Sequence, residues 1–227
     1  MKKAVLVMSI LILTVTLSAL DFERESMYQN ECDKGNLTSC LLLGTMYHTG
    51  DGVNQNFSHA KQLYTKACDG GLAEACSHLG FMYESGHAGM SFEKAIDAYE
   101  KACGLNDAEG CASLGRFFEN GKGVAIDMDE AVAYYDKACD NGNGESCAHL
   151  GLMYEDAQDY VNATEYYEKA CNASEVDACV SLGVMYYNGS NVARDEQKAL
   201  EFFQKACILG DESGCANVHI ITSMGQN

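Results

Sequence analysis

The chain has no proline and no tryptophan, and its 33 acidic residues outnumber the 15 basic ones. Proline usually punctuates loops and ends helices, so its absence predicts a helical chain with turns made by glycine. The formal net charge of −18 would repel nucleic acid and anionic membrane surfaces, and we expect no nucleic-acid partner. This acidity has two interpretations: it keeps an elongated protein in solution, or it attracts a cationic partner.

Long apolar runs are also missing, apart from one at the N-terminus. Lys2 and Lys3 precede an apolar run from Ala4 to Leu13, and small residues follow. This layout predicts a signal peptide over residues 1–19, and its loss would change the net charge from −18 to −20. The run is too short for a confident membrane span, and the first cysteine, Cys32, lies too far on for a lipid anchor. We therefore expect a secreted or periplasmic monomer without a membrane anchor.

The chain is rich in cysteine, with twelve residues in six pairs whose members are eight positions apart. The pairs recur every 36, 35, 36, 32 and 36 residues, a period typical of a solenoid of repeated units. An exported chain with an even cysteine count is expected to form disulfides. Zinc sites use closely spaced ligand pairs that are missing here, so we expect no metal and no cofactor. The expected disulfides are Cys32–Cys40, Cys68–Cys76, Cys103–Cys111, Cys139–Cys147, Cys171–Cys179 and Cys207–Cys215.

When the repeats are aligned on the second cysteine of each pair, Leu, Met or Phe, and Tyr or Phe stand three, six and seven positions after it. This is the apolar face of a helix. Glycine recurs inside it, where it costs about 1 kcal/mol relative to alanine, so we expect a neighbouring helix to approach closely there. These glycines are Gly44, Gly80, Gly115, Gly151 and Gly183.

A second helix is expected after a turn in which Gly50, Gly86, Gly121 and Gly189 suit left-handed caps. It begins after a residue type that favours N-caps and ends in Lys-Ala-Cys, with the lysine near the helix C-terminus. An alanine and then an aromatic residue mark its buried face. The predicted N-caps are Asn56, Ser91, Asp127, Asp159 and Asp195.

The resulting prediction is an all-α, α/α superhelical repeat solenoid of about twelve antiparallel helices, with one disulfide per repeat. The signal peptide (1–19) is followed by a capping half-repeat over 20–34, five helix pairs over 35–209, and a C-terminal capping half-repeat over 210–227. The fourth pair is four residues short in its loop, at Glu155 to Gln158, and a local change is expected there. The five pairs are 35–70, 71–105, 106–141, 142–173 and 174–209.

The pattern Leu-Gly-x-Met-Tyr, a glycine-containing loop and Ala-x-x-x-Tyr-x-Lys-Ala-Cys resembles the Sel-one-like repeat, a relative of the tetratricopeptide repeat. With a cysteine pair per unit and a signal peptide, the mature chain resembles the Helicobacter cysteine-rich proteins over its whole length. That resemblance implies a secreted or periplasmic penicillin-binding protein, and it implies β-lactamase activity, because many family members are classed so.

The sequence contains only part of the motif set that a serine β-lactamase needs. A serine β-lactamase needs Ser-x-x-Lys together with Ser-Asp-Asn and Lys-Thr-Gly elements, and only the first occurs, at Ser58/Lys61 and Ser91/Lys94. Ser91 is also a predicted N-cap, and Ser58 falls in the first turn of a second helix. These four residues are the only catalytic candidates.

A second row of positions lies two, five and nine residues after the second cysteine, away from the apolar face. We call it the variable stripe, because its residues differ between repeats where the packing positions do not. It is either a binding surface or a solvated face that is free to vary. The candidate binding residues are His78, Phe81, Ser85, Ser113, Arg116, Asn120, His149, Leu152 and Asp156.

The sequence thus favours an exported scaffold that binds a peptide, a cell-wall peptide fragment, a penicillin-like ligand or a host protein in a concave groove. The alternative is a β-lactamase that hydrolyses penicillin or cephalosporin derivatives.

Overall fold

The computed structural model describes residues 20–189 and 191–224 and contains twelve helices and no strand in that part of the chain. The predicted signal peptide lies outside the described residues. The chain divides into an N-terminal unit, residues 1–110, and a C-terminal unit, residues 111–227. The described residues contain no helix that is long and apolar enough to cross a membrane.

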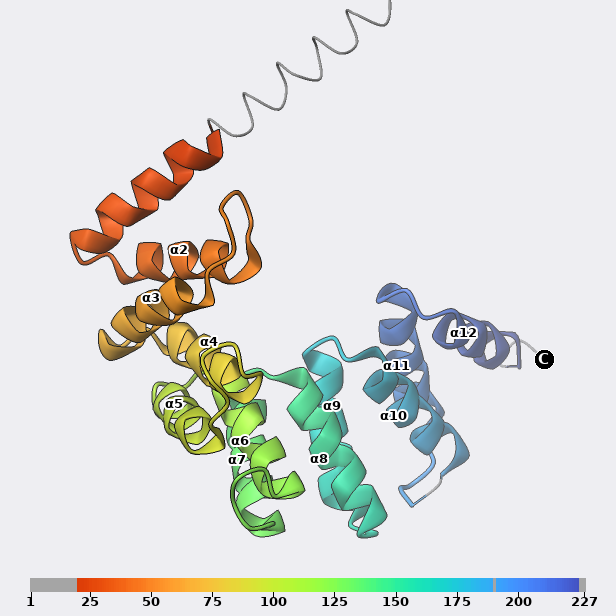
Figure 1. Ribbon diagram of the computed structural model, residues 1–227. Helices are drawn as coiled ribbons and strands as arrows, with labels where there is room; N and C mark the ends of the chain where they lie inside the picture. The colour runs from red at the N-terminus through yellow and green to blue at the C-terminus, as the bar shows by residue number, and fades with distance from the viewer. Residues whose placement is uncertain (1–19, 190, 225–227) are drawn as a thin grey trace, which may run out of the picture. The chain divides into compact units, whose positions relative to one another are not determined.

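Helices alternate between the first and second helix of each predicted repeat, and paired helices such as α8 and α9 pack side by side (Figure 1). A helix over residues 20–33 comes before the first pair. The all-α repeat architecture predicted from the sequence is therefore confirmed. The first helices are α2 (Leu37–Thr49), α4 (Ala73–Glu84), α6 (Ala108–Asn120), α8 (Gly144–Asp156), α10 (Val176–Asn188) and α12 (Glu212–Met224). The second helices are α3 (Phe57–Asp69), α5 (Phe92–Gly104), α7 (Met128–Asp140), α9 (Tyr160–Asn172) and α11 (Glu196–Ile208).

The helix ends follow the predicted capping chemistry. Asn56, Ser91, Asp127, Asp159 and Asp195 each accept a hydrogen bond from a backbone N–H in the first turn of a second helix. The four turn glycines all have positive φ. In the short fourth loop, Gln158 takes a φ of 61°, so a non-glycine residue adopts the left-handed conformation that glycine provides elsewhere.

The recurring glycine of each first helix faces an aromatic ring on the second helix of the same pair. A Cβ atom built on Gly151 would lie 2.6 Å from the Tyr167 ring, and one on Gly183 would lie 2.5 Å from the Phe203 ring. Gly44, Gly80 and Gly115 meet Tyr64, Tyr99 and Tyr135 in the same way. The close approach predicted from these glycines is confirmed, and each ring fills the space that a side chain would occupy.

All twelve cysteines are disulfide-bonded. Five of the bridges join residues eight apart, with Cα atoms 4.6 to 4.8 Å from each other. The bridge links the end of one second helix to the first turn of the next first helix, as predicted. Six disulfides indicate that the chain folds in an oxidising environment. These five bridges are Cys32–Cys40, Cys68–Cys76, Cys139–Cys147, Cys171–Cys179 and Cys207–Cys215.

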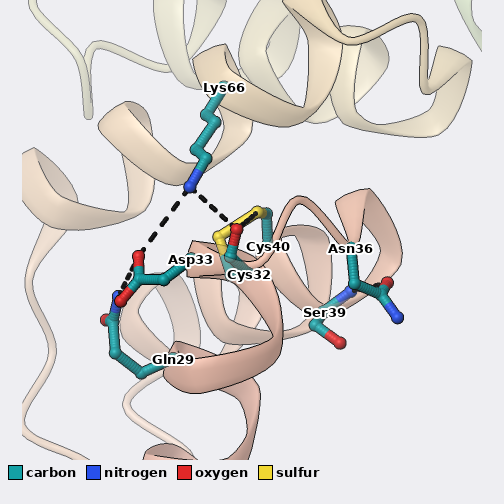
Figure 2. Close-up of a disulfide and its surroundings, with 7 residues drawn as sticks. All are labelled: Gln29, Cys32, Asp33, Asn36, Ser39, Cys40 and Lys66. Carbon is teal, nitrogen blue, oxygen red and sulfur yellow. Dashed lines mark hydrogen bonds and ion pairs between the residues drawn. A yellow bond between two sulfur atoms is a disulfide. The ribbon is translucent and has the colours of Figure 1, made fainter.

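The lysines of the Lys-Ala-Cys segments also tie successive repeats together. In the N-terminal unit, Lys66 Nζ donates to the Cys32 carbonyl oxygen at 2.8 Å and lies 3.8 Å from Asp33, beside the first disulfide (Figure 2). Lys101 reaches Asp69 at 2.8 Å, and in the C-terminal unit Lys169 reaches Asp140 at 3.1 Å. Each lysine therefore contacts the end of the preceding second helix, in addition to its predicted place near its own helix C-terminus.

Candidate functional site

Tyrosine–glutamate pairs recur beside the variable stripe. The ring that packs on the helix glycine extends its hydroxyl to a glutamate eight residues after the second cysteine. Tyr135 donates to Glu119 at 2.7 Å, and Tyr167 donates to Glu155 at 2.6 Å. In the N-terminal unit, Tyr99 donates to Glu84 at 2.8 Å. The rings thus hold these carboxylates in fixed positions near the ends of three first helices, α4, α6 and α8.

Glu119 lines a cleft of about 200 Å³ in the C-terminal unit. Its second carboxylate oxygen accepts a hydrogen bond from His149 Nε2 at 2.9 Å, and the His149 ring lies edge-on to Tyr135 with centroids 4.8 Å apart. Three predicted stripe residues, Arg116, Asn120 and His149, line this cleft together with Glu119, Tyr135, Glu145 and Ser146. The stripe residues from two successive first helices therefore meet at one place.

The hydrogen bonds fix the charge state of this cleft. Burial raises the pKa of Tyr135, and its hydrogen bond to the Glu119 carboxylate raises it further, so the phenol stays neutral. Burial alone would also raise the pKa of Glu119, but hydrogen bonds from Tyr135 and His149 outweigh it and hold that pKa below 4.5. The cleft therefore presents an ionised carboxylate at neutral pH.

The N-terminal unit has an aromatic cluster at the equivalent place. His48 occupies the glutamate position of its repeat, and its Nε2 lies 3.1 Å from Nδ1 of His87. Phe57 stacks on His87 with ring centroids 4.2 Å apart, and the predicted residue Phe81 lies 6.1 Å from His48. Burial, and then the neighbouring His87 and His78, lower the pKa of His48. His48 is therefore held neutral at physiological pH.

The remaining stripe residues have simpler surroundings. His78 stacks on the Tyr64 ring with centroids 5.1 Å apart, and Ser85, the residue that follows α4, donates to the Met82 carbonyl of that helix. Ser113 is buried and accepts a hydrogen bond from Arg116 at 2.8 Å. Leu152 and Asp156 are exposed on α8. Ser113 thus contributes to the packing of α6 rather than to an open surface.

In the two Ser-x-x-Lys segments, the lysine ammonium groups contact an aromatic ring and not the serine hydroxyls. Ser91 Oγ accepts a hydrogen bond from the backbone N–H of Lys94, as its N-cap position predicts. The ammonium groups of Lys61 and Lys94 instead lie over the Tyr83 ring, 5.6 and 5.7 Å from its centroid. Ser58 is exposed in the first turn of α3. The structure therefore shows lysine–aromatic contacts where a serine nucleophile would need its base.

A family model of the Sel1 repeat matches residues 38–72, 73–107, 108–143, 144–175 and 176–211, which is most of the chain. The chain belongs to the Sel1 repeat family. Proteins of this kind generally mediate protein interactions. The resemblance drawn from the repeat pattern is thereby confirmed, and the five matched segments each contain one helix pair of the structure.

Two of the solved structures similar to this Sel1 repeat protein, with TM-scores of 0.67 and 0.68, support the same fold. A Sel1 repeat protein from Oxalobacter formigenes is 29% identical, with 79% of this chain and 75% of that chain covered and a TM-score of 0.67. The protein c5321, a protective antigen of uropathogenic Escherichia coli, is 27% identical, with 88% of this chain but only 44% of that chain covered and a TM-score of 0.68. Helicobacter pylori cysteine rich protein B is 29% identical, with 74% of this chain and 98% of that chain covered and a TM-score of 0.31. No curated protein matches the chain.

The sequence contained one signal for the Tyr–Glu pairs. Glutamate stands eight residues after the second cysteine in three of the five repeats, at Glu84, Glu119 and Glu155. Pairing it with the tyrosine of the following helix requires knowing that the two helices are antiparallel and how far they overlap. The His48–His87 contact had no such signal, because the loop position of His87 is occupied by a different residue type in each of the other repeats.

Proposed function

We propose that this Sel1 repeat protein is a scaffold that binds a peptide or an extended segment of another protein along the first helices of its C-terminal unit. The observation that carries the proposal is an exposed row on successive first helices. Leu152 on α8 is 54% exposed and Val184 on α10 is 41% exposed, and both stand five residues after the second cysteine. Arg116 stands at the same position of α6. Single exposed apolar residues are common on protein surfaces, whereas a row at one repeat position is typical of an interaction surface.

The cleft next to this row gives the ligand a polar anchor. Glu119 is held by Tyr135 and His149, so its carboxylate needs no reordering when a ligand arrives, which lowers the entropic cost of binding. The net charge of −18 attracts cationic partners over a longer range. We therefore propose a basic peptide segment whose apolar side chains contact Leu152 and Val184, in a secreted or periplasmic setting.

A matched set of variants tests this function. Peptides are selected from a display library on the oxidised protein, and the affinity of the best binder is measured for Leu152→Ala/Val184→Ala. We expect affinity to fall roughly tenfold or more, the usual effect of removing a central interface anchor. Val161→Ala is the control, because Val161 is 79% exposed on the second helix α9. Equal affinity for the double variant and the wild type, or a larger loss in Val161→Ala, would exclude the proposed surface.

A further inference from the structure

One disulfide differs from the others in its exposure. Ten of the twelve cysteines are at most 6% exposed. Cys207 is half-buried and Cys215 is exposed, and these two form one bridge. This bridge and four others each join residues eight apart, so the length of the closed loop does not distinguish it from them. What distinguishes the Cys207–Cys215 bridge is its exposure to solvent.

The local structure explains this difference. Cys207 is the penultimate residue of α11 and Cys215 lies in the first turn of α12. At the first junction, by contrast, both cysteines are 0% exposed, and Lys66 of the next repeat donates to the Cys32 carbonyl oxygen beside the bridge (Figure 2). The segment between Cys207 and Cys215 includes Ile208, which is 84% exposed. An incoming reagent therefore meets little obstruction on the Cys215 side.

Thiol–disulfide exchange requires a thiolate to reach one sulfur of the bridge, so its rate depends strongly on access. We propose that the Cys207–Cys215 bridge is a site of covalent modification by a small external thiol. The external thiolate attacks Sγ of Cys215, and a new sulfur–sulfur bond forms as the Cys207–Cys215 bond breaks. The sulfur of Cys207 leaves as a thiolate and takes a proton from water. The product carries a mixed disulfide on Cys215 and a free thiol on Cys207, with no net oxidation or reduction.

The charges around Cys215 select the kind of thiol. Asp211 and Glu212 precede it, and the whole chain is strongly acidic. An uncharged or cationic thiol is therefore favoured over an anionic one. After exchange, no cross-link joins α11 to α12, and α12 is held by the connecting backbone and by packing, in which Val218 and Ile221 contact the core of the C-terminal unit. We expect local loosening over residues 209–224 while α8 to α11 keep their structure.

The test uses the full oxidised chain and cysteamine as the cationic thiol. Brief exposure is followed by acid quenching, alkylation of free thiols and peptide mapping by mass spectrometry. The expected first product carries cysteamine on Cys215 and the alkyl label on Cys207. It should form roughly tenfold faster than any product at a buried bridge, which must wait for local opening. A first adduct on Cys207 or on any other cysteine, or equal rates at all six bridges, would overturn the proposal.

Two further arms use matched reagents and variants. Glutathione, which is anionic, should react more slowly than cysteamine at the same thiolate concentration. Cys171→Ser/Cys179→Ser removes a buried bridge and should leave the reaction at Cys215 unchanged, whereas Cys207→Ser/Cys215→Ser should abolish the early adduct. The wild-type rates decide the proposal even where a variant fails to fold.

Discussion

Replacing Gly151 with alanine should destabilise the protein, although alanine is the better helix former. Helix propensity alone favours alanine by about 1 kcal/mol in a helix interior. The added Cβ, however, would lie 2.6, 2.7 and 3.1 Å from three atoms of the Tyr167 ring, all below the 3.4 Å of ordinary contact. Forcing extra volume into a packed core costs about 1 to 3 kcal/mol.

The ring of Tyr167 has little freedom to move away. It is 3% exposed, and its hydroxyl is fixed to Glu155 at 2.6 Å. We therefore expect the upper part of that range, which leaves a net loss of about 1 to 2 kcal/mol after the gain in propensity. For a chain of this length that corresponds to a fall of about 2 to 8 °C in Tm.

Thermal unfolding followed by circular dichroism, with the disulfides intact, measures this change. Gly104→Ala is the matched control, because a Cβ there has no neighbouring atom within 4 Å, and it should be neutral or slightly stabilising. In a Tyr167→Leu background, alanine at position 151 should lose most of its penalty. A Gly151→Ala variant at least as stable as the wild type would refute the packing argument.

Three other changes have defined outcomes. Reduction of all six bridges should lower Tm strongly, since closing each short loop contributes about 2 to 3 kcal/mol to stability. The far-ultraviolet circular dichroism at low temperature should change little. A collapse of the helical signal would show that packing alone cannot hold the repeats. Ser91→Ala should lower the free energy of unfolding by about 1 kcal/mol, because the N-cap hydrogen bond is lost. Neither Ser91→Ala nor Ser58→Ala should change any turnover of a chromogenic cephalosporin relative to the wild type. Hydrolysis abolished by one of these substitutions would identify a nucleophile. In the folded chain the pKa of His48 lies below 6.5, its value in the unfolded chain. As the pH falls, the unfolded chain therefore binds a proton at His48 before the folded chain does. The contribution of His48 to folding stability is thus complete above pH 6.5 and is lost as the pH falls toward the lowered pKa of the folded chain. His48→Gln should flatten that loss in urea titrations, and His219→Gln, on the exposed face of α12, should not.

The features that the sequence predicted correctly are those whose cause lies within one helix or one turn. Ser91 and Asp127 were identifiable as N-caps from their residue types. Gly151 indicated a close helix–helix contact, because glycine lowers the stability of a helix unless such a contact requires it. The identity of that neighbour, Tyr167, depends on how two helices overlap. The contact of Lys66 with the Cys32 carbonyl depends on the rise between repeats, which no local pattern encodes.

The same distinction applies to the candidate site. The variable stripe marked Arg116, Asn120 and His149, and these residues line one cleft. Glu119 and Tyr135 belong to positions that recur for packing, so variation between repeats could not reveal them. The left-handed conformation of Gln158 was predicted only as a local change, because it is set by the shortened loop.

The central claim is that the first helices, and not the second ones, carry the ligand-binding surface. Methyl NMR spectra of the oxidised, leucine- and valine-labelled protein test it directly during titration with the selected peptide. The account predicts shifts of the Leu152 and Val184 methyl signals, with the Val161 signals unchanged. Shifts confined to Val161 and other second-helix methyls, with Leu152 and Val184 unaffected, would contradict it.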